Sequence, residues 1–278
     1  MAENMSWTQQ DPGFSPPEID TTRPSVARVY DAVLGGKDNY PVDRELTEQL
    51  MAAFPDGGRG AVINRAMLGR AVRHMSGAGI DQFLDLGSGL PTVQNTHEIA
   101  QSANPRAKVV YVDNDPIVLA HGNALLADNR STAVVAGDLR EPERIFAHSG
   151  VSDALDLRRP VGLIMNAVIQ HVLDEEDPVG IIGRYKEMMA PGSYLLLTHF
   201  CSSTPEARRL ESVLLQALGR GQLRSMAQIA GFFEGLEITE PGVVYLPYWR
   251  PDEPVAAPLD ISGLLYGGGL GRKPGGEE

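Results

Sequence analysis

The sequence predicts an α/β fold, in which a mostly parallel sheet carries helices on both faces. From Phe83 onward, short apolar segments alternate with segments of helical periodicity, and this alternation is typical of a parallel sheet. Residues 82–92 have the pattern of a buried strand, a glycine turn and a helix whose first turn contains Pro91. Open α/β sheets hold nucleotide-like cofactors with this strand–turn–helix arrangement.

The individual elements follow from the spacing of apolar residues and from helix-ending residues. Val26, Val29 and Val33 recur at helical spacing, and Gly35-Gly36 ends that helix. Helices are expected over residues 25–34, 42–53 and 62–75 before the sheet, and strands over residues 82–86, 108–112, 133–136, 161–165, 193–198, 236–239 and 264–270. The chain is thereby divided into a disordered tail (1–20), an N-terminal helical cap (21–78), the sheet domain (79–272) and a second disordered tail (273–278).

The composition limits the classes of function. With a formal net charge of −12, the chain lacks the basic surface of a general polyanion binder, so no nucleic-acid partner is expected. No apolar run approaches the ~20 residues of a membrane helix, and the polar N-terminus is not a secretory signal. The single cysteine, Cys201, fits a reducing cytoplasm. We expect a cytoplasmic monomer or homodimer that acts on a small molecule, without a membrane partner.

Carboxylates lie within or just after the predicted strands at Asp85, Asp113 and Asp138. Because the carboxyl ends of parallel strands share one edge, Asp113 and Asp138 should face the same crevice. Asp113 is placed to accept hydrogen bonds from ribose hydroxyls. Asp115 competes for that role, but its place in an Asp-Pro pair favours a helix N-cap.

The residues next to these carboxylates complete a candidate adenosine site. Asn114 would lie along the base, and its alternative is a simple turn residue. Asp138 would receive the exocyclic amine of adenine, while the Leu139 N–H would serve a ring nitrogen. The alternative for Asp138 is to cap the helix expected near Pro142.

An acidic run and two histidines remain as possible metal-binding or catalytic groups. The run at residues 174–177 favours structural use, because Asp177 precedes Pro178 and acids near a helix N-terminus are favoured by its dipole. Clustered histidine or cysteine ligands are missing from the sequence, so no metal is expected. His171 and His199 follow the fourth and fifth strands, where either could be a general base or a packed residue.

Several blocks together resemble the class I S-adenosylmethionine-dependent methyltransferases. They are Leu84-Asp85-Leu86-Gly87-Ser88-Gly89, Asp113, Gly137-Asp138-Leu139 and Asn166-Ala167. Longer blocks resemble one family of this superfamily, the actinobacterial S-adenosyl methyltransferases formerly catalogued as a domain of unknown function. These longer blocks are residues 23–31, 34–40, 43–44, 82–92, 111–116 and 190–199.

The resemblance implies a Rossmann-like class I methyltransferase fold with a seven-stranded sheet. It also implies S-adenosyl-L-methionine as cofactor and S-adenosyl-L-homocysteine as product. The glycine turn would pass beside the methionine part, Asp85 would lie near its amino group, and Asn166 would lie near the sulfonium. The implied cofactor site consists of Asp85, Gly87, Ser88, Gly89, Asp113, Asn114, Asp138, Leu139, Asn166 and Ala167.

The N-terminal helices supply a candidate second wall. The connection between the first two helices is unusually polar and aromatic, and we hypothesise that it folds over the crevice, excludes water and selects the methyl acceptor. Its alternative is a solvated helix–turn–helix packed elsewhere. The residues of this candidate lid are Tyr30, Lys37, Asn39, Tyr40 and Arg44.

Two other functions stay open on the sequence alone. A nicotinamide-dependent oxidoreductase would need a third glycine where Thr92 stands. A regulatory module could bind the cofactor without catalysis, because a fold alone does not establish activity. Pro91 also departs from the general Gly-x-Gly-x-Gly pattern of methyltransferases and removes a possible N–H contact.

Overall fold

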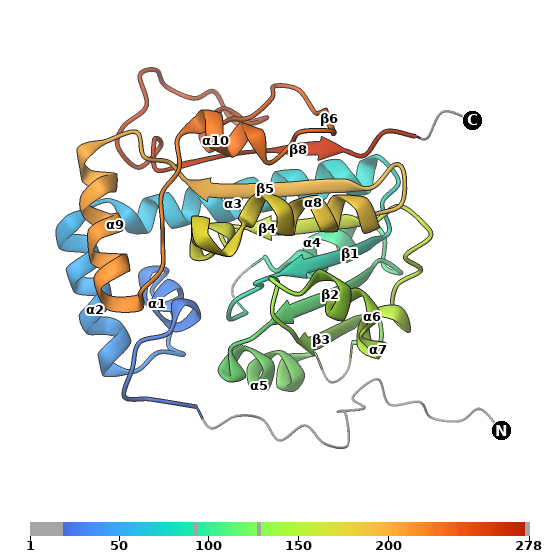
Figure 1. The fold of residues 1–278 in the computed structure, drawn as a ribbon, viewed down its shortest axis with the longest axis horizontal. Coiled ribbons are helices and arrows are strands. Elements are labelled where there is room, and N and C mark those ends of the chain that lie inside the picture. Colours follow the sequence, from blue (N-terminus) through green and yellow to red (C-terminus); the bar gives the residue numbers. More distant parts are fainter. Residues whose placement is uncertain (1–18, 92–93, 127–128, 276–278) are drawn as a thin grey trace.

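The computed structural model describes residues 19–91, 94–126 and 129–275, which form one sheet flanked by helices (Figure 1). The strands lie in the order β3-β2-β1-β4-β5-β8-β6. The first five are parallel, whereas β8 is antiparallel to β5 and also pairs with the short strands β6 and β7. The strands are β1 (Gln82–Leu86), β2 (Lys108–Asp113), β3 (Thr132–Ala136), β4 (Gly162–Asn166), β5 (Tyr194–Phe200), β6 (Glu237–Ile238), β7 (Val244–Tyr245) and β8 (Tyr266–Arg272).

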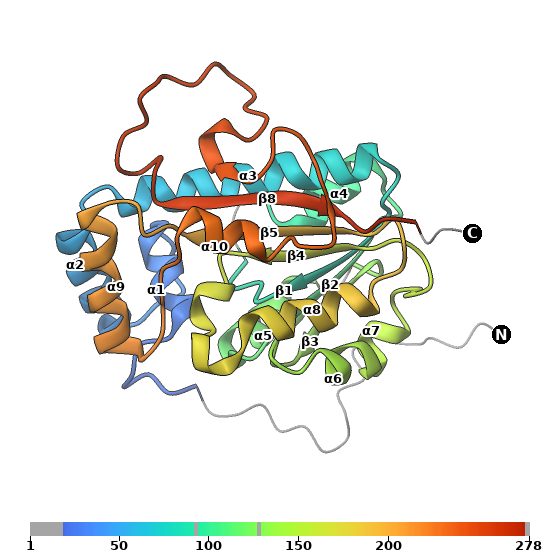
Figure 2. The ribbon, with the colours of Figure 1, turned by 45° about the horizontal axis from the view of Figure 1, so that its top comes forward.

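Helices cover both faces of this sheet, because successive side chains of a strand point to opposite faces. Leu196 of β5 packs with α3 and α4, whereas Leu195 and Leu197 pack with α8 and α10. Figure 2 shows α8 and α10 on the side of the sheet opposite to α3 and α4. The helices are α1 (Val26–Val33), α2 (Pro41–Ala53), α3 (Gly57–Gly77), α4 (Thr96–Ala103), α5 (Pro116–Leu125), α6 (Pro142–Ala147), α7 (Ser149–Ser152), α8 (Pro178–Met188), α9 (Pro205–Leu218) and α10 (Met226–Gly231).

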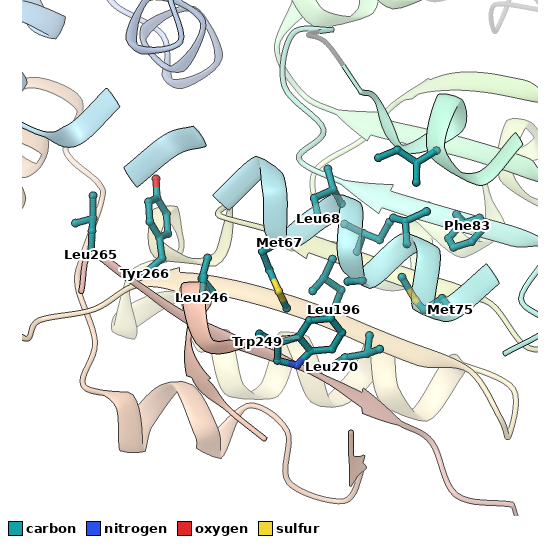
Figure 3. Packing of buried hydrophobic residues seen from close by; sticks show 14 of the residues in the cluster. Met67, Leu68, Met75, Phe83, Leu196, Leu246, Trp249, Leu265, Tyr266 and Leu270 are labelled. Carbon is teal, nitrogen blue, oxygen red and sulfur yellow. The ribbon is translucent and has the colours of Figure 1, made fainter. Parts of the chain in front are cut away.

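Helix α3, which is 21 residues long, packs directly on the sheet (Figure 3). Its fully buried Met67 and Met75 belong to the same apolar cluster as Phe83 of β1 and Leu196 of β5. Trp249, from the segment that precedes β8, belongs to this cluster as well. Each such side chain contributes about 1.5–3 kcal/mol by leaving water. The cluster therefore ties α3, which lies within the predicted N-terminal cap, to the strands that carry the site.

The remaining N-terminal helices α1 and α2 lie beyond the carboxyl ends of the parallel strands, together with α9 (Figure 1). A buried ion pair fixes α1 against the start of α2, since Arg28 Nε donates to Asp43 Oδ2 at 2.8 Å. Asp43 also accepts the backbone N–H groups of Tyr40 at 2.8 Å and Ser25 at 3.1 Å. The pair thereby holds two helices in place over the strand ends.

The predicted fold class is confirmed, and the predicted helix caps at Asp115 and Asp177 are present. One local prediction is wrong: the helix after the glycine turn begins at Thr96 and not near Pro91. Its physical cause is a capping box in which the Asn95 N–H donates to the Glu98 side chain at 2.7 Å. This capping box supplies hydrogen-bond acceptors to free backbone N–H groups at the start of the helix, and a proline side chain cannot accept a hydrogen bond.

The predicted tails fall mostly outside the described part of the chain, which begins at residue 19 and ends at residue 275. Lys273, at the start of the second predicted tail, donates from Nζ to the backbone carbonyls of Lys186, Glu187 and Met189 at 2.7–2.9 Å. The domain boundaries, the oligomeric state and the cytoplasmic location stay predictions.

Candidate active site

A cavity of about 710 Å³ opens at the carboxyl ends of the parallel strands. Its volume lies in the range of small-molecule sites, about 300–1,000 Å³. One side of it is the sheet edge, and the other side is built by α1, α2 and α9. The structure brings every residue of the predicted cofactor site to this cavity: Asp85, Gly87, Ser88, Gly89, Asp113, Asn114, Asp138, Leu139, Asn166 and Ala167.

The glycine turn after β1 depends on glycine at two positions for different reasons. Gly87 has φ +65°, and a Cβ there would meet Val168 Cγ2 at 2.2 Å. Gly89 has φ +68°, but a Cβ there would meet nothing within 4 Å. Positive φ values favour glycine at both positions. At Gly87 the glycine also allows close packing, whereas at Gly89 it leaves space open on the cavity side.

Asp113 joins the end of β2 to this turn. Its Oδ2 accepts the Gly89 N–H and its Oδ1 accepts the Asp115 N–H, both at 2.9 Å. Burial raises the pKa of the carboxyl, and these backbone hydrogen bonds oppose the rise. Each carboxylate oxygen keeps capacity for a further donor. Asp115 instead accepts the Ile117 N–H at 3.0 Å as the N-cap of α5, so the two acids have the separate places that the sequence indicated.

Asp85 is the fourth of the five residues of β1 and is 6% exposed. Its Oδ2 accepts the hydroxyl of Thr96, the first residue of α4, at 2.6 Å. Burial raises the pKa of this carboxyl to about 6, although the Thr96 hydrogen bond and the charge of Arg65 lower it. A neighbouring cation would favour the charged form. The site is therefore suited to an ammonium group.

Asp138 and Leu139 follow β3 at the same edge. Asp138 pairs with Arg140 at 2.5 Å, and the hydrogen bonds and charge of Arg140 hold the pKa of Asp138 below its usual value against the effect of burial. The helix expected near Pro142 is not capped by Asp138, because Glu141 stands at its N-cap position. The Leu139 carbonyl accepts the Tyr185 hydroxyl at 3.0 Å, while its N–H has no partner among the described residues.

The floor of the cavity is the end of β4, where Asn166 and Ala167 are held by β5. The Ala167 N–H donates to Thr198 Oγ1 at 2.8 Å, and that hydroxyl lies 3.1 Å from Asn166 Oδ1. Ala167 has φ +55°, a strained conformation for a residue with a side chain. Such strain persists where the surroundings over-determine it, commonly at functional sites. Thr198 also donates to Asn64 Oδ1 at 2.7 Å, which links the floor to α3.

The two candidate histidines have different surroundings. His171 lines the cavity, and its Nδ1 has no hydrogen-bond partner among the described residues. Burial, with a smaller effect of the Arg220 charge, lowers its pKa to about 4, so the ring is neutral at physiological pH.

His199 is fully buried and does not line the cavity. Its Nδ1 lies 2.8 Å from the Phe200 carbonyl and its Nε2 lies 2.7 Å from Arg224 Nη1. Burial lowers its pKa to about 3. Both ring nitrogens are thus used inside the protein, and we do not retain His199 among the candidate catalytic residues.

Only part of the candidate lid reaches the cavity. Tyr30 lines the cavity, whereas Lys37, Asn39, Tyr40 and Arg44 do not. Asn39 Nδ2 donates to Asp31 Oδ2 at 2.8 Å, and Arg44 Nη1 donates to Asn39 Oδ1 at 3.0 Å. The Tyr40 ring lies under Arg28, 5.2 Å from the guanidinium carbon. These side chains shape the α1–α2 connection, so the wall of the cavity is α1 itself.

Sequence reasoning did not identify five further residues that line the cavity. They are Phe200 at the end of β5, Tyr266 at the start of β8 and three leucines of α9. The apolar face of a helix does not show by itself which partner covers that face. The leucines are Leu210, Leu214 and Leu218.

Within residues 19–91, 94–126 and 129–275, histidine, cysteine, aspartate and glutamate side chains form no group of three that could hold a metal ion. None of the helices in the same part of the chain combines the length and apolar character needed to cross a bilayer.

Comparison with known proteins shows which family this chain belongs to. A family model described as S-adenosyl methyltransferase matches residues 13–274. A Thermobifida fusca YX protein described as a candidate methyltransferase has 45% identity and a TM-score of 0.90, and the match covers 95% of this chain and 100% of that one. For a DUF574 family protein from Streptomyces avermitilis MA-4680, the values are 41% identity, a TM-score of 0.88 and coverage of 92% and 100%.

A more distant match shows the fold alone. An O-methyltransferase family protein from Burkholderia thailandensis has 15% identity and a TM-score of 0.51, with 79% of this chain and 60% of that one covered. No curated protein sequence matches the chain.

Proposed function

The chain belongs to the S-adenosyl methyltransferase family, and we propose that its cavity aligns the methyl donor with a small-molecule acceptor. It is an S-adenosylmethionine-dependent methyltransferase, and the proposal concerns its residues and its acceptor. The observation that carries the proposal is the convergence of the predicted cofactor residues on one side of a cavity whose other side is mostly apolar.

The residues at the sheet edge fit the cofactor on structural grounds. The open space at Gly89 would take part of the ligand, because no protein atom lies within 4 Å of the position of a Cβ. Asp113 would accept the ribose hydroxyls with its remaining lone pairs. The unpartnered Leu139 N–H would serve a ring nitrogen of adenine, and Asp85 would face the ammonium of the methionine part. Asn166 and Ala167 would line the position of the sulfonium.

When bound, S-adenosylmethionine supplies an electrophilic methyl group: the acceptor's lone pair forms a bond to the methyl carbon while the carbon–sulfur electron pair stays on sulfur, which gives S-adenosylhomocysteine. The protein's main task is to hold the acceptor in line with this bond, and alignment can lower such a barrier by about 7–11 kcal/mol. α1, α2 and α9 would exclude water from the acceptor. The Nε2 atom of neutral His171 would take the proton that the acceptor releases, because Nδ1 is enclosed by protein.

The cofactor assignment can be tested with two neighbouring acids. In Asp113→Asn, one carboxylate oxygen and the charge are lost, so S-adenosylhomocysteine should bind about 10- to 100-fold more weakly, as for one or more charge-assisted hydrogen bonds. Asp115→Asn is the matched control, because asparagine also caps helices well. Isothermal titration calorimetry would measure both. Equal affinities of the two variants would contradict the assignment of Asp113.

The acceptor class can be tested with S-adenosylmethionine that carries a labelled methyl group. Incubation of the enzyme with a whole-cell lysate, which offers small molecules, proteins and nucleic acids together, should place the label in low-molecular-weight compounds. Label found in protein or nucleic acid instead would overturn the small-molecule proposal. With a labelled acceptor identified, His171→Ala should lower turnover by about 100-fold or more if His171 is the base, and it should leave the affinity for S-adenosylhomocysteine unchanged.

A further inference from the structure

One hydroxyl on the wall of the cavity has no hydrogen-bond partner in the part of the chain that the structure describes. Tyr266, at the start of β8, is 2% exposed and lines the cavity. Its hydroxyl bonds to no described residue, yet it is not among the polar atoms that protein encloses completely. In Figure 3 this hydroxyl points away from the β8 ribbon and away from the cluster around Trp249. Buried tyrosine hydroxyls usually find a partner, so this one is available to a ligand in the cavity.

An aromatic surface lies directly beside this hydroxyl. Phe200 also lines the cavity and is the register partner of Tyr266 across β5 and β8. The two rings have centroids 4.7 Å apart and planes at 36°. Phe200 comes two residues after Thr198, whose hydroxyl touches the floor residue Asn166. The aromatic pair therefore adjoins the end of the cavity at which methyl transfer is proposed.

Three helices and the residue before β8 line the cavity mainly with apolar side chains. None of the described residues that these elements place on the cavity is acidic, and Arg28 of α1 is paired with Asp43. A cationic acceptor would find no counter-charge there, and burying an unpaired charge is costly. The apolar residues are Val29, Val33, Leu50, Met51, Leu210, Leu214, Leu218 and Leu265.

A second tyrosine adds a hydrogen-bonding group to the same end. Tyr30 of α1 lines the cavity, and its hydroxyl lies 3.3 Å from Asn64 Nδ2 and 3.4 Å from the Ala61 carbonyl. These are long contacts for a hydroxyl. Burial raises the pKa of both Tyr30 and Tyr266, so both stay protonated and can donate to an oxygen atom.

We infer that the acceptor is an uncharged aromatic compound with a hydroxyl or carbonyl oxygen, which packs against Phe200 with that oxygen at the Tyr266 hydroxyl. This inference rests on the proposed function and deepens it by giving the chemical class of the acceptor. Phe200 and the leucines of α9 select a flat apolar body, and Tyr266 selects the oxygen.

Three probes of equal ring size test this class on the full-length protein saturated with S-adenosylhomocysteine. They are 2-naphthol, naphthalene and 2-naphthylmethylammonium, with binding followed by their fluorescence. The wild type should bind 2-naphthol about 5- to 10-fold more tightly than naphthalene, the effect of one net hydrogen bond. The ammonium probe should bind most weakly.

Variants then assign the preference to Tyr266. Tyr266→Phe keeps the ring and removes the hydroxyl, so it should lose the preference for 2-naphthol and leave naphthalene unchanged. Tyr194→Phe is the matched control, because Tyr194 lies at the other end of β5 and does not line the cavity. Phe200→Ala should weaken both probes. If Tyr266→Phe fails to fold, the ranking of the three probes by the wild type still decides the matter.

The outcomes separate this inference from the proposed function. Binding of S-adenosylhomocysteine is measured first, and its failure would overturn the proposed function together with this inference. If S-adenosylhomocysteine binds but the wild type does not prefer 2-naphthol, or Tyr266→Phe keeps that preference, the inference alone is wrong. Equally tight binding of the ammonium probe would also overturn it.

Discussion

Asp85 is a buried acid, and its ionisation should lower the free energy of unfolding of the protein without bound cofactor. Replacing Asp85 with asparagine tests this directly. The carboxyl is 6% exposed, and burial raises its pKa from 3.8 to about 6. The folded state therefore holds a proton that the unfolded state releases between about pH 4 and pH 6. Stability falls as pH rises through this window, and the full cost is present above pH 6. A pKa rise of this size corresponds to about 3 kcal/mol.

Asp85→Asn should remove this cost while keeping the shape of the side chain, because asparagine can also accept the Thr96 hydroxyl. Its free energy of unfolding relative to the wild type should therefore increase by about 2.5 kcal/mol between pH 4 and pH 7.5. Urea unfolding at the two pH values measures this difference. Asp252→Asn is the control, because Asp252 forms an exposed pair with Arg73 at 2.9 Å and such pairs contribute about 0–1 kcal/mol.

The same carboxylate should make cofactor binding depend on pH. An ammonium beside Asp85 needs the ionised form, and at pH 5 a pKa of about 6 leaves roughly one molecule in eleven ionised. The wild type should then bind S-adenosylhomocysteine about tenfold more weakly at pH 5 than at pH 7.5, whereas Asp85→Asn should bind weakly at both. A stability difference that does not change with pH, together with a variant less stable at pH 7.5, would refute this account of Asp85.

Two further predictions concern the glycine turn and the N-terminal helices. Gly87→Ala should destabilise the protein by more than the ~1–2 kcal/mol of a left-handed residue, because its Cβ would meet Val168 at 2.2 Å; Gly89→Ala should cost only about 1 kcal/mol and mainly weaken S-adenosylhomocysteine binding. Thermal unfolding and calorimetry check this pair, and equal stability losses would contradict it. Asp43→Ala leaves Arg28 buried without its partner and should cost about 3–5 kcal/mol. A loss below about 1 kcal/mol in urea unfolding would mean that the ion pair does not hold α1 on α2.

Local chemistry allowed the sequence alone to predict which residues line the sheet-edge side of the cavity. A strand followed by glycine, and an Asp-Pro pair at a helix start, act through backbone geometry within a few residues. This is why the separate places of Asp113 and Asp115 could be predicted before the fold was known. The carboxyl ends of parallel strands meet at one edge, which let Asp138 be added to Asp113 by topology, whereas the role of Asp85 came from the family resemblance. The start of α4 was misplaced because the Asn95–Glu98 capping box outweighed the helix-start signal of Pro91.

Only the tertiary structure showed the rest of the cavity wall. The sequence predicts similar places for His171 and His199, each after a strand, but His171 follows β4 and lines the cavity, whereas His199 lies within β5 and is enclosed beside Arg224. Phe200 and Tyr266 come together through the antiparallel pairing of β5 with β8, across 66 residues of chain. Such contacts depend on which faces of distant elements pack together, and no local spacing of residues records that choice.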